Sequence, residues 1–446
     1  MVNRPLTRLP LWLRKPLCDG LRAALTMYMT AAERESPPAP SKGLDPRGPV
    51  AAGPGQRLAL GRSPFVRLRE LLGDTPPGKP AISLAVGEPQ HAVPSFVESV
   101  LAAHVHEWGR YPMNQGHADF CRAAADWLGR RFELPRPLHP ETEVLVLNGS
   151  REGLFLAALA ASRWVNGRRG PPAMLLPNPF YAAYAAGAIE AGCEPVYLPA
   201  TRAIGFLPDL GALSDALLAR TVAIYLASPA NPQGAVADAA YLSRLVGLAR
   251  RFGFLVFSDE CYSEIYTRHA PPGMLEAAGP DYANVVVFQS LSKRSNLPGL
   301  RVGFAAGDQG FLAGFLELRN VAAPQVPLPA QRVAIAALAD EAHVAENRRL
   351  YAQKFDLADQ IIGDRYGYRR PDGGFFLWLD VSGQGGDEAV TLRLWGQAGL
   401  RVVPGRYLAQ VAPDGSNPGE GFIRVAMVHD NATTAEALHR LVAVLG

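Results

Sequence analysis

A lysine, two serines and an arginine lie close together in the segment SLSKRSNLPGLRVG, residues 290–303. The amine of Lys293 can form a Schiff base with an aldehyde or ketone. Ser290, Ser292 and Arg301 carry the hydroxyl and guanidinium donors that hold a phosphate group. These residue types at this spacing predict a site for a covalently bound, phosphorylated aldehyde. A solvated basic turn is the alternative, because lysine and arginine side chains are mostly exposed.

Two upstream segments carry polar residues at the ends of predicted strands. Asn231 follows the apolar run TVAIYLA, and Asp259 ends the apolar run FLVFSD, with Tyr262 three residues later. Such runs are typical of buried parallel strands, and open α/β sheets bind ligands beyond the carboxyl ends of their strands. A carboxylate can pair with a pyridine nitrogen, while Asn231 and Tyr262 can hydrogen-bond a ring oxygen. Pyridoxal phosphate, which has the aldehyde, the phosphate and the ring, is therefore the predicted cofactor.

A third segment, VLVLNGSREG at 144–153, is predicted as a strand followed by a Gly-Ser turn into a helix. Backbone amides at the start of a helix bind anions, so this turn is a second candidate contact for the phosphate. Each segment also has a plainer interpretation, as a common Asn-Pro turn, a helix cap or an ordinary strand end. The prediction depends on their shared position at one edge of one sheet.

From about residue 56 to its end, the chain resembles the class I/II aminotransferases of the aspartate aminotransferase fold, and the motif around Lys293 matches that family position by position. The resemblance implies that Lys293 binds the cofactor covalently and carries protons, that Asp259 pairs with the ring nitrogen, and that Asn231 and Tyr262 bind the 3-oxygen. It assigns the phosphate to Ser150, Arg151, Ser290, Ser292 and Arg301.

The same resemblance assigns residues around the cofactor and the substrate. Tyr181 matches the aromatic residue that stacks on the ring, and Tyr111 matches a tyrosine that reaches across a homodimer to the neighbouring phosphate. Arg424 matches the arginine that binds the substrate α-carboxylate, for which a guanidinium is well shaped. Gly87 and Asn231 match positions that line the substrate pocket. The implied substrates are small amino acids and 2-oxo acids.

Longer stretches outside these motifs, including AVGEPQHAVP and DEAHVAENRRLYAQKF, resemble the succinyldiaminopimelate transaminases of lysine biosynthesis. The implied reaction transfers an amino group between glutamate and N-succinyl-2-amino-6-oxopimelate. Three alternatives remain at this point: another aminotransferase acting on LL-diaminopimelate, aspartate or alanine, a carbon–sulfur lyase with the same cofactor, and a cofactor-sensing binding protein.

Composition agrees with a cytoplasmic enzyme. The chain has 446 residues, 48% of them hydrophobic, and a net charge of +3. Its basic residues are interspersed with acidic ones, so we expect no nucleic-acid surface. The four cysteines lack CxxC or other metal spacing, which predicts no metal site and fits a reducing compartment. The longest uncharged run, 170–189, contains four prolines, so we expect no membrane span.

The resemblance implies an α/β fold, fold type I of the pyridoxal phosphate-dependent transferases. A large domain over 105–325 would hold a mostly parallel seven-stranded sheet, and residues 56–104 and 326–446 would form a smaller α/β domain. Residues 1–55 are Arg-rich and then Pro-, Gly- and Ala-rich. We expect them to be a disordered or wrongly assigned N-terminal extension.

Overall fold

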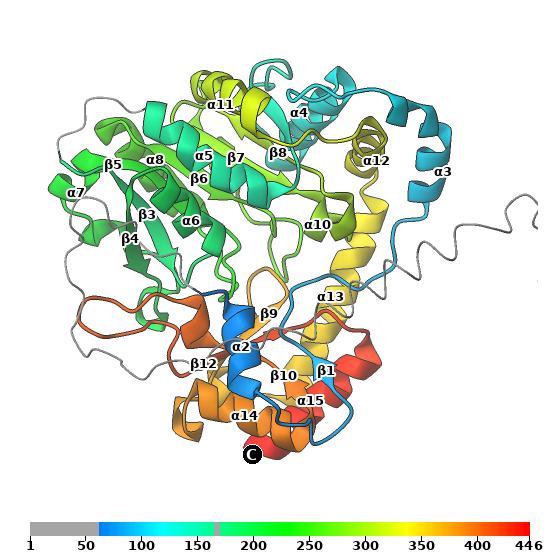
Figure 1. Cartoon of the computed structure of the whole chain (residues 1–446), viewed down its shortest axis with the longest axis vertical. Helices are drawn as coiled ribbons and strands as arrows, with labels where there is room; N and C mark the ends of the chain where they lie inside the picture. The colour runs from blue at the N-terminus through cyan, green and yellow to red at the C-terminus, as the bar shows by residue number, and fades with distance from the viewer. Residues whose placement is uncertain (1–61, 165–169) are drawn as a thin grey trace, which may run out of the picture. The chain divides into compact units, whose positions relative to one another are not determined.

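The computed structural model describes residues 62–164 and 170–446 (Figure 1). The predicted extension, 1–55, lies outside these residues. The strands are β1 (Ile82–Ser83), β2 (Val144–Leu147), β3 (Ala173–Asn178), β4 (Glu194–Pro199), β5 (Thr221–Ala227), β6 (Leu255–Asp259), β7 (Val285–Ser290), β8 (Gly303–Gly307), β9 (Phe376–Asp380), β10 (Leu400–Arg401), β11 (Val403–Pro404) and β12 (Phe422–Ala426). The α-helices are α2 (Pro64–Leu72), α3 (Phe96–Ala103), α4 (Ala118–Phe132), α5 (Ser150–Trp164), α6 (Ala182–Glu190), α7 (Asp215–Arg220), α8 (Ala239–Phe252), α9 (Met274–Ala278), α10 (Leu291–Arg294), α11 (Gln309–Ala322), α12 (Leu328–Ala339), α13 (Ala342–Ile361), α14 (Asp387–Ala398) and α15 (Asn431–Leu445).

Seven strands form one sheet in the order β2-β8-β7-β6-β5-β3-β4. Within this sheet β8 runs antiparallel to both of its neighbours, and the other pairs are parallel. The mostly parallel seven-stranded sheet predicted from the sequence is therefore confirmed. Its central strands are largely apolar because helices cover both faces, and in β7 all six residues are buried.

Alternate residues along each strand face opposite layers of helices. In β2, Val144 and Val146 belong to the same buried cluster as residues of α4, α8, α9 and α12, whereas Leu145 and Leu147 belong to the cluster that includes residues of α5, α6 and α11. This alternation follows from the two-residue period of a strand. Figure 1 shows α5 and α11 on one side of the sheet and α4 and α12 on the other. The buried sheet provides a rigid edge for the loops that follow its strands.

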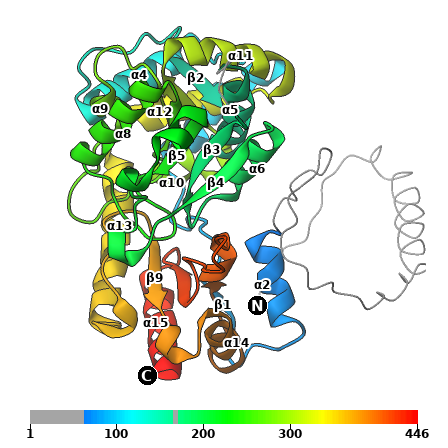
Figure 2. The ribbon, with the colours of Figure 1, turned by 90° about the vertical axis from the view of Figure 1, so that its left-hand side faces the viewer.

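The remaining elements pack around two small sheets. The antiparallel sheet β11-β12-β9 and the parallel pair β1-β10 share an apolar core with α13, α14 and α15. Figure 2 shows α13 extending from the helices of the large sheet to the side of β9 and α15. β1 pairs with β10 at Ile82 and Leu400, which joins the first part of the described chain to its C-terminal part.

The division into domains stays a prediction. The pairing of β1 with β10 brings together parts of 56–104 and 326–446, which we assigned to one smaller domain. Helix α12 follows residue 325, yet it packs on α4 and adds Ala330, Ala334 and Ala337 to the core of the large sheet.

Candidate active site

Lys293 lies on the short helix α10, which begins directly after β7. The Ser290 hydroxyl caps this helix by accepting a hydrogen bond from the Ser292 amide at 3.2 Å. The Lys293 amine donates to the Gly87 carbonyl. Gly87 lies in the loop after β1, so two predicted site residues from distant parts of the sequence meet here.

Burial changes the acidity of this amine. Burial, together with the nearby positive charges of Arg424 and Arg301, lowers the pKa of Lys293 to about 8. The amine lies 5.3 Å from the centroid of the Phe375 ring and 6.0 Å from that of Tyr262. A lysine in this environment holds much more unprotonated amine at neutral pH than an exposed one does, as a nucleophile requires.

Asp259 ends the neighbouring strand β6, and buried groups fix its carboxylate. The Tyr184 hydroxyl donates to Asp259 Oδ2 at 2.5 Å, and the Cys261 amide donates to Oδ1 at 3.2 Å. Tyr184 is 1% exposed, and its burial raises its pKa well above the usual value, so the phenol stays neutral and donates. The Cys261 thiol lies 3.1 Å from Ser150 Oγ, which links this strand end to the start of α5.

The predicted phosphate contacts surround the turn between β2 and α5. Gly149 adopts a φ of +78°, and a Cβ atom at this position would overlap the guanidinium of Arg301. Arg301 precedes β8, which runs antiparallel to β7, and therefore reaches the same edge of the sheet. From α5, Arg151 donates to the Tyr181 hydroxyl, and its guanidinium lies 5.7 Å from the Tyr181 ring centroid.

Arg424 enters the same region from β12. It is 6% exposed, and burial lowers its pKa to about 10, so it remains charged at neutral pH. Its Nη1 donates to Asn231 Oδ1 at 3.2 Å and its Nη2 to the Ala85 carbonyl at 2.7 Å. Its Nε is buried without a partner. A buried guanidinium with a free donor suits an incoming carboxylate.

The arrangement fits pyridoxal phosphate. The turn at Gly149 opens on the amides at the start of α5 and on Arg301, which together suit a phosphate. Lys293 would supply the amine for the aldehyde and Asp259 the carboxylate for the ring nitrogen. Tyr262, whose pKa burial raises well above its usual value, stays neutral and can donate to an oxygen.

Tyr111 is the predicted site residue that the fold does not bring to this edge. Its side chain is 95% exposed. It lines a surface pocket with His106, Arg110, His117 and Arg332. Among the contacts of the described residues, none joins Tyr111 to the other predicted site residues. This position agrees with a side chain that acts in a neighbouring molecule, as the sequence predicts.

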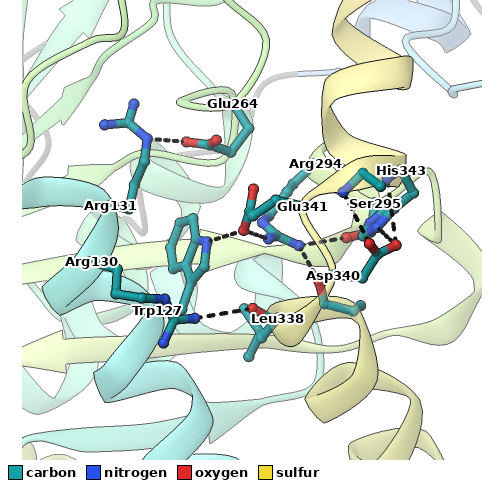
Figure 3. Close-up of polar contacts among 12 residues, drawn as sticks. Trp127, Arg130, Arg131, Glu264, Arg294, Ser295, Leu338, Asp340, Glu341 and His343 are labelled. Carbon is teal, nitrogen blue, oxygen red and sulfur yellow. Dashed lines mark hydrogen bonds and ion pairs between the residues drawn. The ribbon is translucent and has the colours of Figure 1, made fainter.

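Helix α10 is anchored on its other side by the buried residue after Lys293. The Arg294 guanidinium pairs with Glu341, donates to the Ala337 carbonyl at 2.7 Å and lies 5.0 Å from the Trp127 ring centroid. Trp127 Nε1 donates to the same carboxylate at 3.0 Å. Figure 3 shows Arg294, Trp127 and Glu341 converging on one point between α4 and the start of α13.

Sequence reasoning missed three of these contributors. Tyr184 lies in the first turn of α6, three residues after Tyr181, which is the N-cap of that helix, and this closeness in sequence was the available signal. Cys261 lies between Asp259 and Tyr262, and its position in the sequence alone does not indicate that its amide and thiol contact the site. Arg294 carried no distinguishing signal, because its burial depends on α12 and α13, which come much later in the chain.

No helix within 62–164 and 170–446 is long and apolar enough to cross a membrane. In the same part of the chain, no group of three or more histidine, cysteine or acidic side chains is arranged to hold a metal ion.

Comparisons with known proteins agree with this geometry. The model of the family "Aminotransferase class I and II" matches residues 79–441. An LL-diaminopimelate aminotransferase of Desulforudis audaxviator is 33% identical over 86% of this chain and 95% of its own length. An aminotransferase structure from Neisseria meningitidis is 38% identical, with a TM-score of 0.81 over 87% of this chain and 98% of its own.

A probable N-succinyldiaminopimelate aminotransferase from Thermus thermophilus is 27% identical, with a TM-score of 0.76 over 86% of this chain and all of its own. The lyase and binding-protein alternatives have no counterpart among these relatives. The chain therefore belongs to the aminotransferase class I and II family, whose members depend on pyridoxal phosphate, and it is an aminotransferase.

Proposed function

We propose that this aminotransferase exchanges an amino group between glutamate and a diaminopimelate-type substrate, with N-succinyl-LL-diaminopimelate as the favoured amino acid. The long resembling stretches of the sequence support the succinylated substrate, as does the similarity to the Thermus protein. The similarity to LL-diaminopimelate aminotransferases supports the unsubstituted compound as a second candidate. Both substrates carry the same amino acid end, so the two proposals differ only in the distal group.

The observation that carries the proposal is the position of Arg424. Its buried guanidinium has an unpartnered Nε and lies close enough to Lys293 for the two charges to interact. In the proposed reaction, Arg424 binds the α-carboxylate and turns the Cα–H bond toward the lysine. A bidentate carboxylate pair supplies this orientation.

The remaining residues of the site either move or hold a proton or bind the cofactor. Bound pyridoxal phosphate supplies an electron sink for the negative charge that develops at the substrate Cα. Lys293 Nζ would remove the Cα proton and deliver it to C4′, the aldehyde carbon of the cofactor, a role that its lowered pKa favours. Asp259, held by Tyr184, keeps the ring nitrogen protonated, while Asn231 and Tyr262 bind the 3-oxygen. Ser150, Arg151, Ser290, Ser292 and Arg301 bind the phosphate, and Tyr181 stacks on the ring.

The test is a half-reaction with the purified, cofactor-loaded protein. Conversion of the cofactor from its aldehyde to its amine form is followed by absorbance during separate titrations with N-succinyl-LL-diaminopimelate, LL-diaminopimelate, aspartate and glutamate. We expect conversion by glutamate and the succinylated compound at much lower concentrations than by the others. A preference for LL-diaminopimelate would select the second candidate, and a preference for aspartate would contradict both.

The Lys293→Ala variant is the control for this assay. It removes the proposed proton carrier, so we expect a loss of about 10³-fold or more in the rate of conversion. A variant that retained steady-state transamination would contradict the role proposed for Lys293.

We also propose that the enzyme is a cytoplasmic homodimer. The exposure of Tyr111 supports a site that is completed by a second subunit. Within the described residues, Cys121, Cys193 and Cys261 are buried and form no disulfide, which supports a reducing compartment.

A further inference from the structure

Helix α10, which carries Lys293, is too short to hold its own end. It has four residues, and the last carbonyls of any helix lack partners within that helix. Asn347 supplies the missing donor from α13. Its Nδ2 donates to the Lys293 carbonyl at 3.1 Å and to the Arg294 carbonyl at 3.3 Å. Asn347 is 5% exposed, so water does not compete freely for these bonds.

The orientation of the Asn347 amide is fixed by His91, which contacts the amide oxygen. His91 Nδ1 lies 2.5 Å from Asn347 Oδ1, and His91 Nε2 lies 2.6 Å from Lys354 Nζ. A lysine ammonium only donates, so Nε2 accepts and Nδ1 carries the ring proton toward Asn347. The Asn347 NH₂ group then points at the two carbonyls. Burial and the charge of Lys354 lower the pKa of His91, which keeps the ring neutral as this chain of bonds requires.

The same bonds return to the loop that touches the lysine amine. His91 lies four residues after Gly87, whose carbonyl accepts from Lys293 Nζ. Asn296, just after α10, donates to the Ala92 carbonyl of this loop at 3.0 Å. Lys293 is thus connected to one loop through its side chain and, by way of Asn347 and His91, through its main chain. The side chain and the main chain of Lys293 are therefore both held by the loop that contains Gly87 and His91.

We propose that Asn347, supported by His91 and Lys354, is a positioning residue for Lys293 that sets where the amine lies relative to the cofactor and the substrate Cα. This inference rests on the proposed role of Lys293. The Arg294 guanidinium holds α10 to the end of α12 and the start of α13 (Figure 3). Asn347 instead acts on the carbonyl of the lysine itself.

Asn347→Asp tests the proposal, since it keeps the shape of the side chain but replaces the donor with an acceptor facing two carbonyls. We expect kcat of the half-reaction to fall about tenfold with KM changed less than about threefold, as displacement of the amine predicts. We also expect the pH midpoint of the bound-cofactor absorbance to shift by about half a unit or more. A purely structural role would lower the melting temperature without moving this midpoint.

Asn284→Asp is the matched control. Asn284 precedes β7, at the opposite end of the strand that leads to Lys293, and its Nδ2 donates to the Phe254 carbonyl at 3.0 Å. We expect it to lose stability without a change in the absorbance midpoint. If Asn347→Asp does not fold, Lys354→Met removes the support of His91 and should move kcat and the midpoint in the same directions, by less.

The proposal is overturned if the folded variant matches Asn284→Asp in kcat within twofold and in its absorbance midpoint. Failure of the proposed function is detected separately. Borohydride reduction of the wild-type protein loaded with pyridoxal phosphate should leave the cofactor on the peptide that contains Lys293. Its absence there would refute the role of Lys293 before any Asn347 variant is compared.

Discussion

The chemistry of the site depends on how the protein sets the proton affinity of single groups. Lys293 is partly buried and Arg424 is buried, and burial lowers the pKa of each, to about 8 and about 10. Arg424 therefore remains a cation near neutral pH, while Lys293 is partly unprotonated. The two basic residues therefore suit the different roles proposed for them, Arg424 as a fixed charge and Lys293 as a nucleophile and proton carrier.

The first prediction concerns the pH dependence of cofactor attachment. An amine attacks an aldehyde only when unprotonated, and with a pKa of about 8 roughly one tenth of Lys293 is unprotonated at pH 7. The rate at which cofactor-free protein binds pyridoxal phosphate covalently should therefore rise with pH and level off above about 8. Stopped-flow absorbance measures this rate.

Arg424→Gln serves as a check on the cause of this profile. The charge of Arg424 lowers the pKa of Lys293, so its removal should move the plateau to higher pH. A wild-type rate that kept increasing beyond pH 9.5, as for an ordinary exposed lysine, would contradict the prediction.

At the scale of elements, the site depends on a close approach between a turn and a side chain. Gly149 joins β2 to α5 with a left-handed backbone, and its missing Cβ leaves room for Arg301. The turn brings the amides of the α5 N-terminus and the guanidinium to one place. The contact between Gly149 and Arg301 requires β2 and β8 to be neighbouring strands, so neither strand determines it alone.

Gly149→Ala should therefore weaken cofactor binding. A positive φ costs a residue with a Cβ about 1–2 kcal/mol, and the new methyl group would also displace Arg301. We expect the Kd for pyridoxal phosphate to rise about tenfold or more, measured by absorbance titration of cofactor-free protein.

Gly247→Ala is the matched control, because Gly247 lies in α8 with no atom within 4 Å of the position that a Cβ would occupy. It should bind the cofactor normally and gain about 0.5–1 kcal/mol in its free energy of unfolding. Equal cofactor affinity in the two variants would show that the turn does not contribute to the site.

At the scale of the whole molecule, Tyr111 lies apart from the other predicted site residues. The other predicted site residues contact or closely approach one another at the edge of the large sheet, while Tyr111 is 95% exposed. Val105, Trp108 and Met113, near it in the sequence, are also exposed and apolar. An exposed group of large apolar residues is typical of an interface between proteins.

A mixing experiment tests the proposed homodimer. Tyr111→Ala and Lys293→Ala proteins should each have low activity, but a mixed dimer would contain one site with an intact Lys293 and an intact Tyr111 of the other subunit. Random exchange of subunits should restore about a quarter of wild-type activity, measured after joint refolding. No recovery, with dimers verified by sedimentation, would contradict action in trans.

The sequence by itself determined the large sheet and most of the residues at its edge. Continuous apolar runs such as VVVF must be buried on both faces, and polar residues that directly follow them must lie at strand ends. Lys293, Asp259 and Asn231 could be predicted for this reason, because their positions depend only on neighbouring residues. The motif around Lys293 also identified the family before any contact was known.

Only the tertiary structure decided which distant groups complete the site. Arg424 and Asn231 are 193 positions apart, and Asn347 caps the lysine carbonyl from 54 positions away. The local sequence pattern cannot predict such contacts, since they depend on the order of the strands and on the packing that brings Asn347 of α13 to α10. The burial that lowers the pKa of Lys293 has the same origin: it is produced by elements that meet only when the whole chain has folded.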